Sequence, residues 1–285
     1  MNPLFNRVTI VGVGLLGASL GLALKARGLA GRVIGVGHRQ ISIDTALHTG
    51  AVDEAFLELP PALKDTDLVV LATPAALVIP KLNEIRPLIH PETLVTDVAS
   101  TKAAICEHAK NTWPTPRRFI GSHPMAGSER FGPEHGDKDF YVGAVTLVEK
   151  NDGLDAAAHD AIRELWRAVG ASIIDIDPVE HDALLARTSH LPHIVSSVLA
   201  TLAVRQGDIR SVIGNGFRDM TRIAGSRPEL WRDICLTNRP AILDALAELE
   251  QDLQQFSKAL RDEDDALIFE LFQQGKTARK KAVDS

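Results

Sequence analysis

The sequence predicts an α/β fold, a doubly wound parallel sheet, followed by an all-α domain. From Arg7 to about Asp177, short runs rich in Val, Ile and Leu alternate with stretches of helical periodicity. After Pro178 no convincing strand pattern follows, and helical spacing continues to the end of the sequence. A length of 285 residues suits two domains better than one core. We therefore expect one domain over residues 1–177 and a second over residues 178–285.

The elements of the first domain follow one another at the spacing of a parallel sheet with helices on both faces. The predicted buried strands are Val8–Val11, Arg32–Val36, Leu68–Ala72, Thr93–Asp97 and Phe119–Gly121. The predicted helices are Leu15–Arg27, Ala75–Ile89, Thr101–Trp113 and Leu154–Val169. Two further runs, Tyr141–Val148 and Ser172–Ile176, are expected to extend the same sheet.

The second domain contains an apolar seam with a period of about 3.5 residues. Its members are Ile242, Leu246, Leu249, Leu253, Phe256 and Leu260. Two interpretations stay open: the seam packs within its own domain, or it is buried against a second subunit. Because a domain of about 108 residues with several long helices has little room to cover such a seam, we favour the second interpretation and expect a homodimer joined through the helical domain.

The composition is typical of a cytoplasmic protein without a nucleic-acid or membrane partner. The chain carries 31 basic and 37 acidic residues, a net charge of −6, whereas nucleic acids and anionic membranes normally bind basic surfaces. No apolar stretch reaches the roughly 18–20 residues that span a bilayer, and the N-terminal segment does not show a signal-peptide pattern. Two cysteines, Cys106 and Cys235, fit a reducing compartment.

A glycine-rich turn follows the first predicted strand and opens the first predicted helix. It fits the pattern G-x-G-x-x-G, in which glycines allow a tight turn and bring backbone N–H groups against a pyrophosphate at a helix N-terminus. The alternative is a strand–helix turn without a ligand. We expect a Rossmann-type domain whose dinucleotide contacts include Gly12, Gly14, Leu15, Leu16 and Gly17.

The end of the second strand favours NADP over NAD. An acidic residue there would accept hydrogen bonds from the ribose 2′-hydroxyl of NAD, but the sequence has no acid before Asp44. Arg39, with His38, is suited to pair with a 2′-phosphate. The alternative is a solvated loop arginine in an NAD enzyme. The remaining expected cofactor contacts follow the next two strands: Thr73, Pro74, Asp97 and Ser100.

His123 is the candidate base. Its segment, Gly121–Gly127, begins at the carboxyl end of a predicted strand, which is where ligands bind in open α/β sheets. An imidazole with a pKa near about 6.5 can accept a proton near neutrality, and Ser100 is placed to hydrogen-bond the imidazole or a substrate hydroxyl. The alternative is a histidine that caps a loop.

Five motifs occur in the order typical of one enzyme family. They are Gly12-x-Gly14-x-x-Gly17, Asp97-x-x-Ser100-x-Lys102, His123-Pro124-Met125-Ala126-Gly127, Ser189-His190-Leu191-Pro192-His193 and Gly216-Phe217-Arg218-Asp219-x-Thr221-Arg222-Ile223-Ala224. In this combination the chain resembles the prephenate/arogenate (cyclohexadienyl) dehydrogenases over nearly its whole length. The resemblance implies an NAD(P)-dependent oxidative decarboxylation that forms the aromatic ring of tyrosine, and a Rossmann domain joined to a helical dimerisation domain.

The resemblance also implies roles for single residues. His123 resembles the base that takes the proton from the ring hydroxyl of the substrate, and Ser100 resembles its hydrogen-bonding partner. Arg222 resembles the cation that holds a substrate carboxylate. Glu129 and Asp219 stand where the family often has acids that pair with this arginine and gate the pocket.

His193 bears on the choice of substrate. Family members with a histidine there tend to accept prephenate, and an imidazole at that position can donate a hydrogen bond to a substrate oxygen; we expect prephenate to be turned over, alone or with arogenate. Substrate contacts are also expected from His190 and Ser122. His190 and His193 lie three residues apart like a metal pair, but no third ligand has convincing spacing, so no metal site is expected. Pro192 should interrupt the helix between them.

Two other functions share parts of this pattern. A β-hydroxyacid dehydrogenase has the same plan of domains, but its chemistry uses a lysine on an early helix of the second domain, and no lysine occurs between Lys150 and Lys258. A non-catalytic dinucleotide sensor is the other alternative. The joint presence of His123, Ser100 and Arg222 argues against it.

Overall fold

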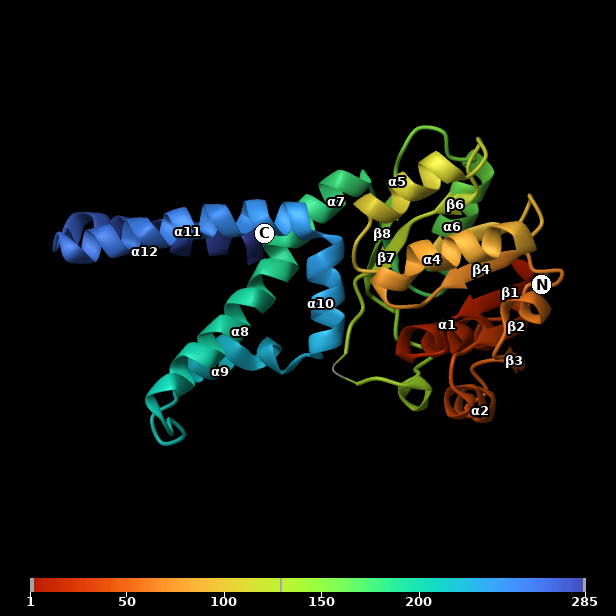
Figure 1. Cartoon of the computed structure of the whole chain (residues 1–285), viewed down its shortest axis with the longest axis horizontal. Coiled ribbons are helices and arrows are strands. Elements are labelled where there is room, and N and C mark those ends of the chain that lie inside the picture. Colours follow the sequence, from red (N-terminus) through yellow and green to blue (C-terminus); the bar gives the residue numbers. More distant parts are fainter. Residues whose placement is uncertain (1–2, 129, 284–285) are drawn as a thin grey trace. The chain divides into compact units, whose positions relative to one another are not determined.

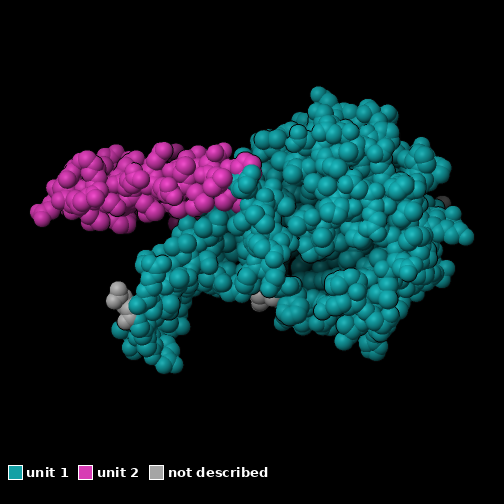
Figure 2. All heavy atoms as spheres, in the orientation of Figure 1, with its two compact units in different colours: residues 1–239 teal, residues 240–285 magenta. Residues whose placement is uncertain are grey.

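The computed structural model describes residues 3–128 and 130–283 (Figure 1). The chain forms two compact units, residues 1–239 and residues 240–285 (Figure 2). The first unit holds both the sheet and the helices that follow it, up to Arg239. The predicted boundary after residue 177 lies inside this unit and stays a prediction.

The first unit is built on a six-stranded sheet. In chain order its strands are β1 (Phe5–Val11), β2 (Ala30–Val36), β3 (Glu54–Phe56), β4 (Leu68–Leu71), β5 (Leu94–Asp97) and β6 (Phe119–Ile120). All of its strand pairs are parallel, and the spatial order is β3-β2-β1-β4-β5-β6. The direction of winding reverses between β1 and β4, which is the place where ligands bind in such sheets. The predicted Rossmann-type fold is confirmed.

Helices cover both faces of the sheet because buried apolar residues alternate along its strands. In β4, Leu68 and Val70 belong to a core cluster with α1 (Leu15–Ala26) and α6 (Ala156–Ala168). Their neighbours in β4 belong to a second cluster, with α4 (Ala75–Ile85) and α5 (Ala103–Thr112). The four predicted helices are therefore present, each slightly shorter than its periodicity indicated.

Three short elements between β2 and β4 were not predicted from the sequence: α2 (Gln40–His48), β3 and α3 (Leu59–Ala62). Helix α2 buries only Ile43 and Ala46, so its apolar pattern is weak. Strand β3 has three residues, none of them fully buried.

The prediction that Tyr141–Val148 and Ser172–Ile176 extend the large sheet is wrong. They contribute to a separate three-stranded sheet of β7 (Ser122–Pro124), β8 (Val145–Glu149) and β9 (Ser172–Ile176), in which β7 is antiparallel to β8. The chain leaves the large sheet at Gly121, whose N–H donates to the carboxylate of Glu149 at 3.0 Å. Tyr141 lies before β8, and its buried hydroxyl donates to the carbonyl of Leu16.

The described chain after Ile176 is helical and contains no strand. Its helices are α7 (Pro178–Leu185), the π-helical turn η3 (Ala186–His190), α8 (Leu191–Ala203), η4 (Val204–Gln206), α9 (Asn215–Thr221), η5 (Arg222–Gly225), α10 (Pro228–Thr237), α11 (Arg239–Arg261) and α12 (Asp265–Val283). The irregular turn η3 ends two residues before Pro192, in agreement with the predicted interruption. Within the described residues, no helix is both long and apolar enough to cross a membrane.

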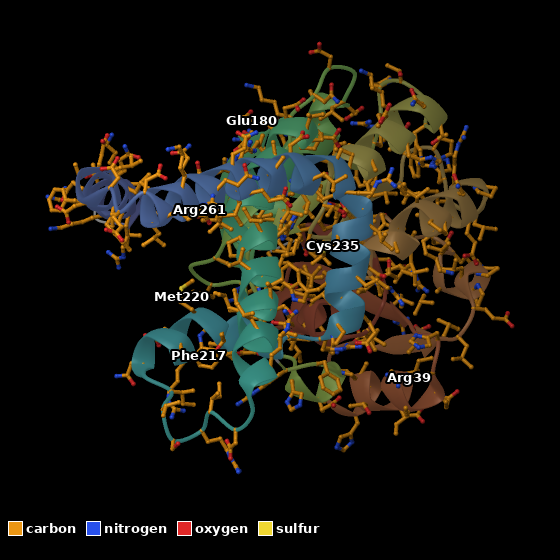
Figure 3. The ribbon with its side chains drawn as sticks, turned by 60° about the vertical axis from the view of Figure 1, so that its left-hand side comes forward. Arg39, Glu180, Phe217, Met220, Cys235 and Arg261 are labelled. Atoms are coloured by element: carbon orange, nitrogen blue, oxygen red, sulfur yellow. The ribbon has the colours of Figure 1, made fainter. Side chains whose placement is uncertain are left out.

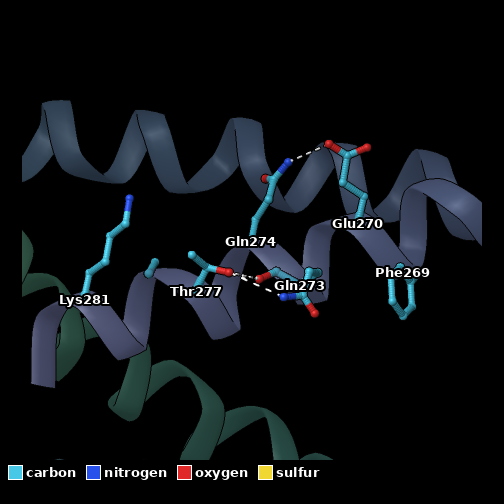
Figure 4. A pocket seen from close by; sticks show the side chains of 7 residues that line it. Phe269, Glu270, Gln273, Gln274, Thr277 and Lys281 are labelled. Carbon is cyan, nitrogen blue, oxygen red and sulfur yellow. Dashed lines mark hydrogen bonds between the residues drawn. The ribbon is translucent and has the colours of Figure 1, made fainter. Parts of the chain in front are cut away.

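The second unit is a pair of helices formed by most of α11 and by α12. Phe256 and Phe272 contact each other edge to face, with ring centroids 5.5 Å apart. In the predicted seam, Ile242 is buried, whereas Leu253 and Leu260 are more than half exposed. A shallow hollow of about 430 Å³ runs along α12 and is lined by Phe269, Gln273 and Lys281, among others (Figure 4). A single chain therefore leaves part of the seam open to solvent.

Candidate active site

The glycine-rich turn between β1 and α1 leaves room where a phosphate would lie. Gly12 has a φ of +105°, and a Cβ there would meet the carbonyl oxygen of Ala72 at 2.3 Å. A Cβ at Gly17 would meet the carbonyl oxygen of Gly12 at 2.0 Å, whereas a Cβ at Gly14 would have no atom within 4 Å. No side chain caps the N-terminus of α1. The open space at Gly14 and the uncapped amides of α1 fit the pyrophosphate of a dinucleotide.

Thr73 lies beside this turn at the end of β4. Its backbone N is 3.2 Å from the position of a Cβ on Gly12. Its hydroxyl oxygen is buried and finds no hydrogen-bond partner among the described residues. Pro74 follows and is exposed. A buried hydroxyl without a partner is costly unless a ligand satisfies it, so this position also fits a bound dinucleotide.

The end of β2 presents basic side chains to solvent. His38 and Arg39 are exposed, and Arg39 precedes the first residue of α2 (Figure 3). Arg39 forms no ion pair with any described residue. Asp53, the acid near β2, is already occupied: its carboxylate accepts from Lys25 at 2.5 Å and from the N–H of Val33 at 2.8 Å. A carboxylate free to bind a ribose 2′-hydroxyl is therefore not found here among the described residues.

Asp97 forms its hydrogen bonds within the protein, and its predicted contact with a cofactor stays a prediction. It is fully buried, and its carboxylate pairs with the ammonium group of Lys102, which is 2% exposed. The same carboxylate accepts from the N–H groups of Ala99 at 3.0 Å and Ser122 at 3.1 Å. Asp97 thus connects the ends of β5 and β6 and uses its acceptors within the protein.

His123 lies on β7, just past the end of the large sheet, and is 7% exposed. Its Nδ1 atom is 3.0 Å from Nε2 of His181 on α7. Nδ1 of His181 is 2.7 Å from Oδ1 of Asp182. No described residue hydrogen-bonds Nε2 of His123, so this atom is available to a substrate.

Burial favours the neutral form of both imidazoles. Desolvation lowers the pKa of His123 well below its usual value, and the proximity of His181, Lys102 and His190, each of which carries positive charge when protonated, acts in the same direction. Burial also lowers the pKa of His181, although the bond to Asp182 acts in the opposite direction. A neutral imidazole with a free nitrogen is the form that a general base requires.

The two serines predicted as site residues differ in burial and in hydrogen bonding. Ser100 is half-buried, and no hydrogen bond joins it to His123 in the part of the chain that the structure describes; the Nδ1 partner of His123 is His181. Ser122 is fully buried, and its hydroxyl lies 2.9 Å from Oγ1 of Thr96. The hydroxyl of Ser122 is thus engaged inside the core, and its predicted contact with the substrate stays a prediction.

The histidines of the second motif have different surroundings. His190 is buried, and its Nδ1 accepts from Nδ2 of Asn238 at 3.0 Å. Burial lowers the pKa of His190 to about 4. His193 is half-buried and stacks on the ring of Trp231 with centroids 3.5 Å apart, while its Nδ1 donates to the carbonyl of Ser189. Trp231 thus fixes the plane of the His193 ring.

Arg222 is exposed at the start of η5, directly after α9, which carries Phe217 and Met220 (Figure 3). Burial lowers the pKa of His193, and the charge of Arg222 acts in the same direction. Asp219 is exposed, and no ion pair between it and Arg222 is found among the described residues. Glu129, the other predicted partner of Arg222, lies outside the described residues.

Two family models match the chain. Residues 20–175 match the prephenate dehydrogenase nucleotide-binding domain, and residues 177–274 match the prephenate dehydrogenase dimerization domain. The chain belongs to the prephenate dehydrogenase family. It is an oxidoreductase of this family, as the motifs had indicated, with a nucleotide-binding domain and a dimerization domain.

Relatives of the family match over nearly the whole chain. A prephenate dehydrogenase of Bacillus subtilis is 30% identical over 98% of this chain and 76% of its own length. The structure of a prephenate dehydrogenase from A. aeolicus in complex with hydroxyphenyl propionate and NAD+ superposes with a TM-score of 0.90 at 27% identity, covering 97% of this chain and 98% of that one. A Synechocystis arogenate dehydrogenase gives a TM-score of 0.84 at 32% identity, covering 97% and 100%.

Sequence reasoning missed three residues of the site: His181, Asp182 and Asn238. His181 and Asp182 follow the N-cap Asp177 of α7, so they read as ordinary residues of a helix start. They lie 58 and 59 positions from His123, and no spacing rule connects them to it. Asn238 follows α10 and donates to both His190 and the carbonyl of Asp182. The adjacent His and Asp were the only signal available.

Proposed function

We propose that the protein uses NADP, or NAD, to decarboxylate prephenate oxidatively to 4-hydroxyphenylpyruvate, with arogenate as a second substrate that would yield tyrosine. The observation that carries this proposal is His123: a buried, neutral imidazole at the carboxyl edge of a dinucleotide-binding sheet, with Nε2 open. The family membership of the chain supports the same reaction.

The chain's own residues position the substrate and move one proton. The bound dinucleotide would supply the acceptor for the hydride that leaves the hydroxyl-bearing ring carbon. His123 takes the hydroxyl proton at Nε2 as the carbonyl forms at that carbon. The bond to the ring carboxylate then breaks, its electron pair completes the aromatic ring, and carbon dioxide leaves. His123 returns the proton to the phenolate oxygen, so neither a metal nor a covalent nucleophile is required.

Arg222 and His193 are the proposed substrate-binding pair. An exposed guanidinium suits a carboxylate through two parallel hydrogen bonds. The ring of His193, held against Trp231, presents Nε2 as a donor because Nδ1 is used by Ser189. Wild-type enzyme should therefore turn over prephenate in initial-rate assays with both substrates and both cofactors, and His193→Val should raise KM for prephenate more than for arogenate. Turnover of neither substrate would refute the proposed function.

Arg39 is proposed to bind the 2′-phosphate of NADP. Arg39→Ala should weaken NADP by about 1–3 kcal/mol and barely affect NAD, because only NADP carries the phosphate. Equilibrium dialysis with each cofactor measures the two affinities. Arg32→Ala is the matched control, since Arg32 lies on β2, before the segment that carries Arg39, and is paired with Glu54. Equal losses of affinity for NADP and NAD would show that Arg39 does not bind the 2′-phosphate.

We also propose that the protein is a cytoplasmic homodimer joined through its helical part. Placing Asp at both Leu249 and Leu253 puts charge into the seam of α11, which should yield monomer in sedimentation experiments. The exposed Leu57 of the first unit supplies a control, Leu57→Asp, that should stay dimeric. Circular dichroism checks that the helices persist. An intact dimer of the double variant would mean that the seam packs within one chain.

A further inference from the structure

We propose that His181 and Asp182 are positioning residues that hold His123 in one tautomer, with the proton on Nδ1 and the lone pair on Nε2. The proposal deepens the function given above and rests on the role of His123 in it. It is carried by the hydrogen-bonded chain His123–His181–Asp182, which joins β7 to α7 within the first unit.

Asp182 determines which atoms donate and which accept in this series of hydrogen bonds. The carboxylate of Asp182 has only acceptors. It accepts from the N–H of Lys102 at 2.8 Å and from the N–H of Ala103 at 2.9 Å, and so stands at the N-terminus of α5, where a negative charge is favoured. Oδ1 of the same carboxylate lies 2.7 Å from Nδ1 of His181. Nδ1 of His181 must therefore carry a proton.

The next bond follows from the first. A neutral imidazole has one N–H, so His181 with a proton on Nδ1 presents a lone pair at Nε2. Nδ1 of His123, 3.0 Å away, must then be the donor. His123 consequently has its lone pair on Nε2, the atom to which no described residue bonds. The buried carboxylate thus determines which nitrogen of His123 accepts a proton.

The surrounding charges are consistent with two neutral rings. Burial is the main cause of the lowered pKa of His123, and His181, Lys102 and His190 act in the same direction. Lys102 and Asp97 face His181, as does Asp182, and the two carboxylates raise its pKa against the effect of burial. When His123 accepts the substrate proton, it becomes an imidazolium that donates from Nδ1 to His181. No proton needs to leave Nδ1 in this step, because orientation and charge stabilisation suffice.

Asp182 also caps α5, so the test must separate a positioning role from a structural one. Oδ1 of Asp182 accepts from both the N–H of Lys102 and Nδ1 of His181, whereas Oδ2 accepts from the N–H of Ala103. In Asp182→Asn the amide oxygen should therefore stay at the Oδ1 position, which keeps the tautomer of His123. Asp182→Ala removes the acceptor of His181, so the proton of His181 and the tautomer of His123 are no longer fixed. Asp177→Ala is the matched control, because Asp177 caps α7 through the N–H groups of Val179 and Glu180 and takes no part in the hydrogen-bonded chain.

The tautomer is read directly from ¹⁵N chemical shifts of the histidine rings, with His123→Asn to assign the His123 signals. Wild type, Asp177→Ala and Asp182→Asn should show the Nδ1–H form of His123, and Asp182→Ala a mixture with the Nε2–H form. Turnover of prephenate by Asp182→Ala should fall at least about tenfold below that of Asp182→Asn, with KM for the dinucleotide unchanged. A wild-type tautomer and wild-type turnover in Asp182→Ala would overturn the proposal.

A second pair of variants tests the proposal if Asp182→Ala folds poorly. Gln at 181 still offers an oxygen to Nδ1 of His123, whereas Leu offers none, so His181→Gln should retain at least about tenfold more kcat than His181→Leu. Equal rates in the two variants would contradict the proposal. The ring shifts need no substrate, so they test the tautomer even if wild-type enzyme ignores prephenate and arogenate, an outcome that would refute the proposed function instead.

Discussion

His123→Asn should lower kcat by about 10²–10⁴-fold and leave dinucleotide affinity nearly unchanged. Asparagine keeps a polar side chain of similar reach but cannot accept a proton near neutrality. Stopped-flow or initial-rate assays of cofactor reduction measure kcat, and equilibrium dialysis measures the affinity. His135→Asn, at an exposed histidine of the loop after β7, is the control and should behave as wild type. A His123→Asn enzyme with full turnover would remove His123 from the mechanism.

The pH profile of the wild-type enzyme adds a second readout for the same residue. Because burial lowers the pKa of His123, the imidazole stays neutral to a lower pH than a solvated histidine. The apparent pKa of the acidic limb of the kcat/KM profile should therefore lie below about 6.5, the usual pKa of a histidine. A limb at or above that pH would assign the required base to another group.

Lys102→Met should lower the free energy of unfolding by about 3–5 kcal/mol. This is the largest loss of stability that we expect from one substitution. The change leaves Asp97 as a fully buried carboxylate without its cation. The midpoint of urea unfolding measures the loss. Lys81→Met removes an exposed pair with Glu84 at 2.5 Å and should cost only about 0–1 kcal/mol. Similar midpoints for the two variants would show that the ion pair of Asp97 and Lys102 contributes little.

Local sequence patterns were enough to predict five of the six strands of the large sheet, all but β3, and the glycine turn. The strands are short apolar runs, and the need for glycine at residues 12 and 17 comes from backbone atoms that a Cβ would strike. Local patterns could not show which polar side chains form their hydrogen bonds within the protein. Asp97 and Ser122 stand in motif positions, yet Lys102 and Thr96 occupy their hydrogen-bonding atoms.

The partners of His123 were beyond prediction for a related reason. His181 reaches His123 only because α7 packs where β7 leaves the large sheet, a contact between residues 58 positions apart. Arg39, by contrast, lies exposed just after β2, a position that depends only on the strand and the turn after it. Its contact with a 2′-phosphate stays a prediction.

The most direct measurement follows the ring carboxylate of prephenate during turnover. Prephenate labelled with ¹³C in that carboxylate is supplied to wild-type enzyme with NADP, and the label and the reduced cofactor are followed together by NMR and absorbance. We expect one equivalent of labelled carbon dioxide or bicarbonate for each NADPH, with 4-hydroxyphenylpyruvate as the other product. Reduced cofactor formed with the label retained in the organic product would contradict the proposed oxidative decarboxylation and favour a simple hydroxyl oxidation.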